Sequence, residues 1–181
     1  MLVITARRAR SAAVFFGAGV ALMLAACAAQ TEISSDYDRS ANFAAFHTFA
    51  LNQREHHGIP NPLVAVRVEQ EITESLQRNG YTLAADPMSA DFLVDFSIGA
   101  QDRLDIHSYP TALPVGPMWG NSLDVRQYRE GTLNIDIFDQ RTRRPVWHAS
   151  AQKELSQKDL EQPAEPVHEA VTSVLAKFPP A

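Results

Sequence analysis

Cysteine is almost absent from this sequence, which has one, Cys27, in 181 residues. A single cysteine cannot form a disulfide within the chain, so packing alone has to hold the fold together. A long hydrophobic run is absent too, although a membrane-spanning helix needs roughly 20 apolar residues. The apolar run at 12–26 has about fifteen residues and reaches only around 22 Å as a helix. We therefore expect neither a disulfide framework nor a membrane-spanning helix.

Basic charge is scarce beyond the first residues. The whole chain carries 16 basic and 21 acidic side chains, for a net charge of −5. Arg7, Arg8 and Arg10 belong to the opening segment, so the part from Cys27 onward has 13 basic against 21 acidic groups, a net charge of −8. Such a surface repels phosphate backbones, which argues against a nucleic-acid partner.

Catalytic and metal-binding motifs are missing as well. No serine stands in a Gly-x-Ser-x-Gly sequence, the setting of the nucleophile in many hydrolases. The chain has six histidines, but none is spaced as His-x-x-x-His, and His56 and His57 are adjacent, which rarely lets both bind one ion. We expect no metal site and no cofactor.

What the sequence does have is a characteristic start. Three arginines precede the short apolar run, which is typical of a cleaved export signal. Its end, Leu24-Ala25-Ala26-Cys27, resembles the lipobox of bacterial lipoproteins, which implies cleavage before Cys27 and lipidation of its thiol. The prediction is a lipoprotein signal peptide at 1–26, a lipidated tether at 27–32 and a single domain at 33–181. The alternatives are a secretory signal with a chance cysteine and a short uncleaved anchor.

The residue after Cys27 bears on the membrane to which the lipid would attach. In enteric-type bacteria an aspartate there resembles a signal for inner-membrane retention, and this chain has Ala28 instead. Two or more acyl chains anchor a protein stably, whereas one holds it only marginally. We therefore expect an outer-membrane lipoprotein whose domain faces the periplasm.

Apolar periodicity predicts the elements of the domain. Strands are expected at 30–37, in the second half of 42–51, and at 90–100, 131–139 and 146–155, the last two as a hairpin. A helix is expected to begin at Asn61–Pro62 and to end at Asn79–Gly80. A second helix should begin at Pro163 or Pro166 and stop at Pro179–Pro180. The expected fold class is α+β, an antiparallel β-sheet with two helices packed on one face.

The segment 105–124 is interpreted as a long loop, because its prolines and glycines argue against a helix or a central strand. Tyr109, Met118 and Trp119 would give this loop a semi-rigid apolar surface. We therefore name these three residues as a candidate binding loop. The alternative is a mobile spacer without a ligand.

Acidic side chains on the expected strands offer one route to catalysis. Asp91 and Asp95 share a face of one strand, and Asn134 and Asp136 share a face of another. If those strands are neighbours, two carboxylates could come within reach for acid–base chemistry. The simpler interpretation is a solvated sheet face.

Several segments together resemble one bacterial lipoprotein family, domain of unknown function 4136. The similar segments are NFAAFHTFAL, Asn79-Gly80-Tyr81, ADFLVDFS, YREGTLNIDIFDQRTRRPVWHASA and VLAKFPP. The resemblance covers nearly all of the chain after the tether, and it implies an envelope lipoprotein with an α+β domain. It supplies no catalytic residue.

Three functional hypotheses remain open. The first is a non-catalytic envelope protein that binds or scaffolds a protein, glycan or lipid partner beside the membrane. The second is an envelope hydrolase that uses Asp95 and Asp136. The third is a purely structural packing role.

Overall fold

The computed structural model describes residues 31–52, 61–112 and 119–180. They form a six-stranded sheet with the strand order β1-β6-β5-β4-β2-β3. The strands are β1 (Glu32–Tyr37), β2 (Thr48–Leu51), β3 (Thr82–Leu83), β4 (Phe92–Ala112), β5 (Trp119–Asp139) and β6 (Pro145–Leu155). The predicted hairpin of residues 131–139 and 146–155 is confirmed, since β5 and β6 pair antiparallel.

The expectation of a purely antiparallel sheet is wrong. Strand β2 runs parallel to both of its neighbours, β3 and β4, so the sheet is mixed. Helix α1 (Pro62–Arg78) lies between β2 and β3 in the chain and provides the crossover that a parallel pair requires. Apolar alternation shows which face of a strand is buried but not the direction of its neighbour, so the pattern could not reveal this. The class remains α+β.

The ends of α1 follow from capping. The side chain of Asn61 accepts a hydrogen bond from the backbone N–H of Leu63, and Pro62 occupies the first turn. At the other end Gly80 has a φ of 94°, a left-handed conformation that glycine adopts without a steric penalty. Both predicted ends of this helix are confirmed.

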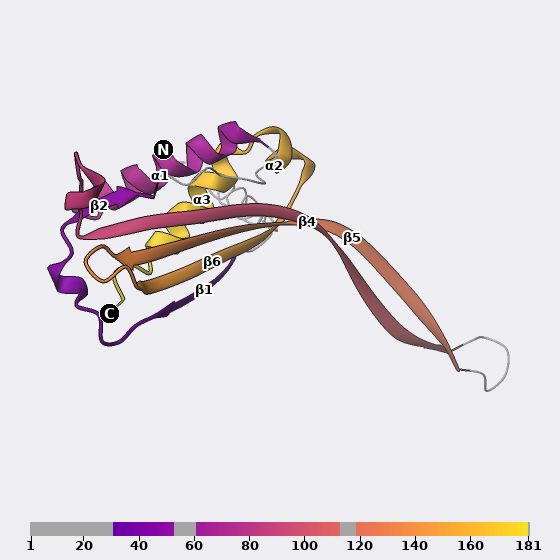
Figure 1. Ribbon diagram of the computed structural model, residues 1–181. Helices are drawn as coiled ribbons and strands as arrows, with labels where there is room; N and C mark the ends of the chain where they lie inside the picture. The colour runs from indigo at the N-terminus through magenta and orange to yellow at the C-terminus, as the bar shows by residue number, and fades with distance from the viewer. Residues whose placement is uncertain (1–30, 53–60, 113–118, 181) are drawn as a thin grey trace, which may run out of the picture.

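Helices α1 and α3 (Ala164–Leu175) cover one face of the sheet (Figure 1). The sequence did not predict the short helix α2 (Gln157–Glu161), which lies between them in the chain. Ser156 and Asp159 form a reciprocal capping box at its first turn. Short 3₁₀ helices occupy Phe43–Ala45 and Pro87–Ser89. Among the described helices, none has the length and hydropathy needed to cross a bilayer.

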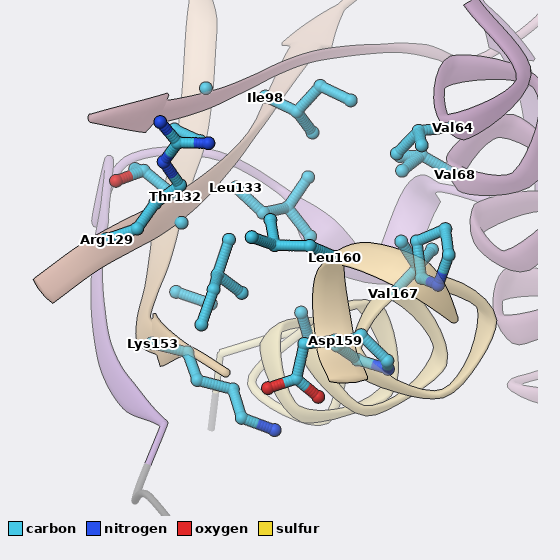
Figure 2. A pocket seen from close by; sticks show the side chains of 18 of the residues that line it. Val64, Val68, Ile98, Arg129, Thr132, Leu133, Lys153, Asp159, Leu160 and Val167 are labelled. Atoms are coloured by element: carbon cyan, nitrogen blue, oxygen red, sulfur yellow. The ribbon is translucent and has the colours of Figure 1, made fainter. Parts of the chain in front are cut away.

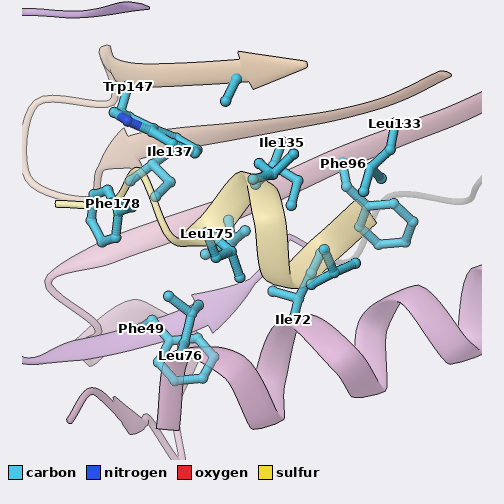
Figure 3. Close-up of a cluster of buried hydrophobic side chains, with 14 of the residues drawn as sticks. Phe49, Ile72, Leu76, Phe96, Leu133, Ile135, Ile137, Trp147, Leu175 and Phe178 are labelled. Atoms are coloured by element: carbon cyan, nitrogen blue, oxygen red, sulfur yellow. The ribbon is translucent and has the colours of Figure 1, made fainter. Parts of the chain in front are cut away.

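Aromatic rings fill the core at the end where β2 enters the sheet. Phe92 is fully buried, and its ring centroid lies 5.2 Å from that of Phe46, 5.3 Å from Tyr81 and 5.6 Å from Phe178. Trp147 also packs against Phe178, with ring centroids 5.4 Å apart (Figure 3). Ring pairs of this geometry add stability beyond that of their buried area.

Strands β4 and β5 continue far beyond the body of the domain. They are paired without interruption from Phe92↔Asp139 to Ala112↔Trp119, and the outer part projects as a two-stranded ribbon (Figure 1). We call residues 101–112 and 119–128 the arm. The interpretation of 105–124 as a loop is therefore wrong for its described residues. Pro110 is accommodated because a two-stranded ribbon is all edge, and strand edges tolerate proline.

Candidate functional site

The first candidate site is the apolar face of the arm. Leu104, Ile106, Leu123 and Val125 are 66%, 61%, 68% and 56% exposed. Ile106 lies directly opposite Val125 in the ladder, and strand alternation places Leu104 and Leu123 on the same face. This face continues that of Phe96 and Ile98, so it is the core face extended beyond the helices. Exposed apolar side chains gathered in this way make this face a candidate interaction surface.

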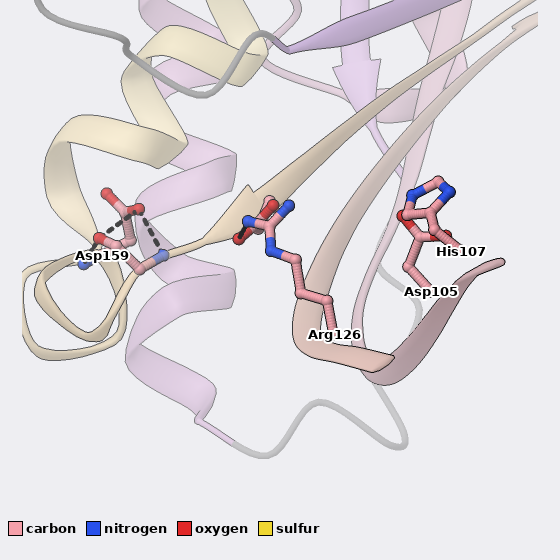
Figure 4. Close-up of polar contacts among 6 residues, drawn as sticks. Asp105, His107, Arg126 and Asp159 are labelled. Carbon is pink, nitrogen blue, oxygen red and sulfur yellow. Dashed lines mark hydrogen bonds and ion pairs between the residues drawn. The ribbon is translucent and has the colours of Figure 1, made fainter. Parts of the chain in front are cut away.

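The opposite face of the arm is charged (Figure 4). There Arg126 reaches back to Glu154 on β6, and His107 lies 3.0 Å from Asp105. At the base of the arm, on the apolar side, Asp102 accepts a hydrogen bond from Arg129 and raises the pKa of that guanidinium. Exposed ion pairs of this kind contribute little stability. The charged side chains therefore keep this face of the arm hydrated but do little to hold the arm against the rest of the domain.

Both edges of the arm are open among the described strands. Strand β2 pairs with β4 only at Phe49↔Phe92 to Leu51↔Val94, and β6 pairs with β5 only as far out as Arg129↔Leu155. The arm therefore offers unpaired backbone N–H and C=O groups beside its apolar side chains. Such edges can pair with another strand.

The sequence singled out four other positions around the arm and the anchor. Tyr109 and Trp119 lie on β4 and β5 near the end of the arm, but their side chains, like all of Met118 and Cys27, lie outside the described part of the structure. The candidate binding loop is thus a strand pair as far as the structure describes it. The apolar side chains that the structure places on the arm were not among those predicted.

The second candidate site is an apolar cavity of about 290 Å³ at the end of the core nearest the arm (Figure 2). Its floor is the sheet, and its sides are α1, α2 and α3. The main apolar lining residues are Val64, Val68, Ile98, Leu133, Leu155 and Val167. Leu155 lies against Gly131, where a Cβ would come within 2.9 Å of the leucine side chain. Glycine at this position lets Leu155 settle against the strand as part of the wall.

Polar groups lie at the rim of the cavity and are bonded to one another. Lys153 donates to Glu169 at 2.7 Å, and Thr31 donates to the other oxygen of the same carboxylate at 3.1 Å. The bond from Lys153, followed by that from Thr31, holds the pKa of Glu169 below its usual value despite partial burial. Asp159 is engaged with Ser156 in the cap of α2. These bonds fix the first described residue of the chain, Thr31, at the rim.

The third candidate site is the carboxylate pair proposed from the sequence. Asp95 lies directly opposite Asp136 on the sheet face away from the helices, and His148 lies 2.7 Å from Asp136. Asp95 also accepts hydrogen bonds from Asn52 and from the backbone N–H of Phe96. The strands are neighbours, as the catalytic hypothesis required, but the pair lies on a half-exposed sheet face and not at the apolar cavity.

Asp91, which lies just before β4, has a structural position instead. Its Oδ2 accepts hydrogen bonds from the backbone N–H groups of His47 and Thr48 and from the hydroxyl of Thr48. Burial opposes ionisation, but these hydrogen bonds outweigh it and lower the pKa of Asp91. The carboxylate ties the start of β2 to β4.

Three of the described histidines each lie beside one carboxylate. His107 pairs with Asp105, His148 with Asp136 and His168 with Glu71, on separate parts of the fold. Within the described ranges, no three acidic, histidine or cysteine side chains are grouped as metal ligands. His56 and His57 fall outside those ranges.

Sequence comparison identifies the family. The profile of DUF4136, a domain of unknown function, matches residues 33–180. No functionally curated protein matches the chain.

Solved structures share the fold. A DUF4136 family protein from Bacteroides thetaiotaomicron is similar at 20% identity and a TM-score of 0.54, over 82% of this chain and 96% of that one. A PDZ domain protein from Parabacteroides distasonis is similar at 14% identity and a TM-score of 0.58, over 84% of this chain. This chain spans only 37% of the length of that PDZ domain protein. At these identities the likeness concerns the fold alone, whereas the profile match spans most of the chain: the protein belongs to the DUF4136 family.

Proposed function

We propose that this protein is a lipid-anchored, non-catalytic outer-membrane protein that faces the periplasm and holds a protein partner on the apolar face of its arm. The observation that carries the proposal is the arm, with four apolar side chains more than half exposed on one face and open strand edges beside them.

The anchor part of the proposal depends on the N-terminal sequence. Leu24-Ala25-Ala26-Cys27 has the lipobox pattern, and Thr31 is only four residues further on. A fully extended chain covers roughly 3.3–3.6 Å per residue, so this tether would hold the domain within about 14 Å of the lipidated cysteine. The arm would then search for its partner along the same membrane, which raises the effective concentration of anything anchored there.

The partner part of the proposal depends on the stability of the arm. A two-stranded ribbon is marginal in water unless a further strand or helix covers its apolar face. The helices cover Phe96 and Ile98 but not Ile106 or Val125, which are 61% and 56% exposed. A protein partner suits this surface better than a glycan does, since it can supply both apolar side chains and a strand for the open edge.

The test is site-specific photo-crosslinking in the native host. A photoreactive side chain placed at Val125, on the apolar face, should give one protein adduct of reproducible mass. The same side chain at the adjacent Asp124, on the charged face, is the matched control and should not. A second substitution, Leu123→Ser, should remove the adduct from Val125 while leaving the protein folded. Equal labelling from the two faces would contradict a specific partner.

The anchor is tested separately by intact-mass analysis of the protein from host membranes. The expected species begins at Cys27 and carries the added mass of acyl chains, and Cys27→Ser should lose both the mass and the membrane association. A species that retains residue 1 would refute the anchor without bearing on the arm.

The alternative function is an envelope hydrolase, and the opposed carboxylates Asp95 and Asp136 with His148 at 2.7 Å favour it. This pair could share acid and base roles. It predicts a turnover on envelope material that Asp95→Asn and Asp136→Asn each abolish, whereas Ser97→Ala, on the same face, retains it. Unchanged turnover in both asparagine variants would exclude this function.

A further inference from the structure

The cavity beside the arm has the chemistry of a site for a flexible aliphatic chain. Among the described residues, its lining contains valine, leucine, isoleucine, alanine and proline side chains but no aromatic ring. A planar ligand would therefore find no ring to stack on, and a sugar would find few hydrogen-bond partners, because the polar rim groups Lys153, Glu169 and Asp159 already bind one another or Ser156. Apolar surface without directional groups selects for a hydrocarbon ligand.

The size of the cavity also fits a ligand. At about 290 Å³ it is larger than the apolar cavities of about 150 Å³ that bind benzene. The space opens to solvent at its rim, so it is a pocket between the sheet and the helices and not a sealed void.

The wall of the cavity nearest the arm is made of the smallest residues, so a larger side chain there would fill the cavity. Ala100 lies opposite Gly131 in the ladder, and both line the cavity with minimal side chains. On the other side, Leu160 of the short helix α2 completes the wall while remaining 41% exposed. A five-residue helix with a part-exposed Leu160 is a wall that can yield to an entering chain.

The position of the rim indicates where the hydrocarbon would come from. Thr31 lines the cavity and is hydrogen-bonded to Glu169 on α3, and Cys27 is four residues before it. On the proposed lipid anchor, on which this step rests, the tether would hold the rim within about 14 Å of the lipidated cysteine at the membrane surface. Bilayer lipids are then the most concentrated source of hydrocarbon at the opening.

From these observations we infer that the cavity binds one acyl chain of a lipid from the surrounding membrane, with the lipid headgroup left outside at the rim. The site is distinct from the apolar face of the arm, which is exposed and ribbon-shaped. It gives the protein a second contact with the membrane, made by its folded domain.

The experiment uses the full chain with Cys27→Ser, which cannot be lipidated at that position, and dansyl-labelled undecanoic acid as the probe. The probe should bind in the cavity with a blue shift and increase of its fluorescence, and palmitate should displace it. Ala100→Trp, which places a ring in the opening, should weaken binding by about tenfold or more. Gln101→Trp, one residue along and on the opposite face of the ribbon, is the matched control and should bind as the parent does.

Two further variants make the outcome decisive. Ile106→Ser on the arm should leave probe binding unchanged, and a loss there would assign the probe to the arm and overturn the inference. Ala170→Leu blocks the cavity from the helix side, so it should weaken binding as Ala100→Trp does even if the tryptophan variant folds poorly. Equal binding by the parent, Ala100→Trp and Ala170→Leu would overturn the inference.

The lipidated protein, purified in parallel, separates the inference from the proposed anchor. If mass analysis finds no lipid on Cys27 but the probe binds the cavity, the anchor fails and the aliphatic site remains. If the Cys27→Ser chain binds the probe and the lipidated chain does not, the occupant is the protein's own lipid, which overturns the membrane-lipid source that we infer.

Discussion

The two ends of the core are built from different side chains and are filled to different degrees. Around Phe92 the rings of Phe46, Tyr81 and Phe178 pack with centroids within 5.6 Å. Around Leu133 the side chains are aliphatic and enclose a cavity of about 290 Å³. Both ends lie between the same sheet and the same two long helices, so the backbone does not impose the difference. One end is filled by contacting aromatic rings, whereas the other holds a pocket that opens to solvent.

The largest expected effect is at the aromatic end. Phe92→Ala removes a fully buried ring with four ring neighbours, and it should lower the free energy of unfolding by about 3–5 kcal/mol. Urea denaturation followed by tryptophan fluorescence measures this. A loss below about 2 kcal/mol would show that the aromatic end is less tightly packed than its geometry indicates.

A matched pair of leucine truncations compares the two ends directly. Leu76→Ala, in the fully buried cluster, should cost about 3 kcal/mol, because a new void opens in a packed region. Leu155→Ala, at the cavity wall, should cost only about 1 kcal/mol, because that side chain is only partly buried. Equal losses of unfolding free energy in denaturant titrations of the two variants would show that the two ends of the core do not differ in packing.

The attachment of β2 at the aromatic end should depend on pH. Asp91→Asn weakens the hydrogen bonds from His47 and Thr48 and should cost about 1–2 kcal/mol at neutral pH. The folded-state pKa of Asp91 lies below its ordinary value of 3.8. The carboxylate's contribution is therefore complete above that value and is lost as the pH falls through the folded pKa.

Unfolding measured at neutral pH and at about pH 3 tests this linkage. The difference in the free energy of unfolding between the parent and Asp91→Asn should be smaller at the lower pH. Asp86→Asn offers a control, since Asp86 caps the short 3₁₀ helix at Pro87–Ser89 rather than joining two strands. A difference in unfolding free energy that stays constant with pH would show that the charge on Asp91 does not contribute to stability.

The smallest expected effect is an increase in the free energy of unfolding. Ala170→Leu adds methyl groups to the cavity from α3 and should stabilise the protein by about 0.5–1 kcal/mol, as cavity filling commonly does. Thermal unfolding measures the shift. A destabilisation would show that the cavity walls are rigid and that the space is too small for the added groups.

Much of this fold could be read from the sequence where side chains repeat with a clear period. Helix α1 was predicted at both ends because Asn61 and Gly80 are capping residues, and the β5–β6 hairpin because Leu133, Ile135 and Ile137 alternate. Strand β3 has only two residues, Thr82 and Leu83, which is too short for any periodic signal. Its parallel pairing with β2 was missed for the same reason.

The functional surfaces were harder to foresee. Pro110 suggested a loop, yet a ribbon with two open edges tolerates proline, so the arm was mistaken for irregular chain. One signal was available in the alternation of Leu104 and Ile106 with charged residues, which is the pattern of a strand. The cavity gave no signal, because its lining comes from residues as distant as Val64 and Val167, which only the folded chain brings together.

The uninterrupted pairing of β4 with β5 joins the arm directly to the wall of the cavity. The ladder passes from Ile106↔Val125 in the arm through Ala100↔Gly131 at the wall without a break. The apolar face of the arm and the wall of the cavity are therefore built from the same two paired strands. A partner that changes the twist of these strands when it binds the arm would also change the affinity of the cavity for its ligand, and the coupling free energy would be the same in both directions.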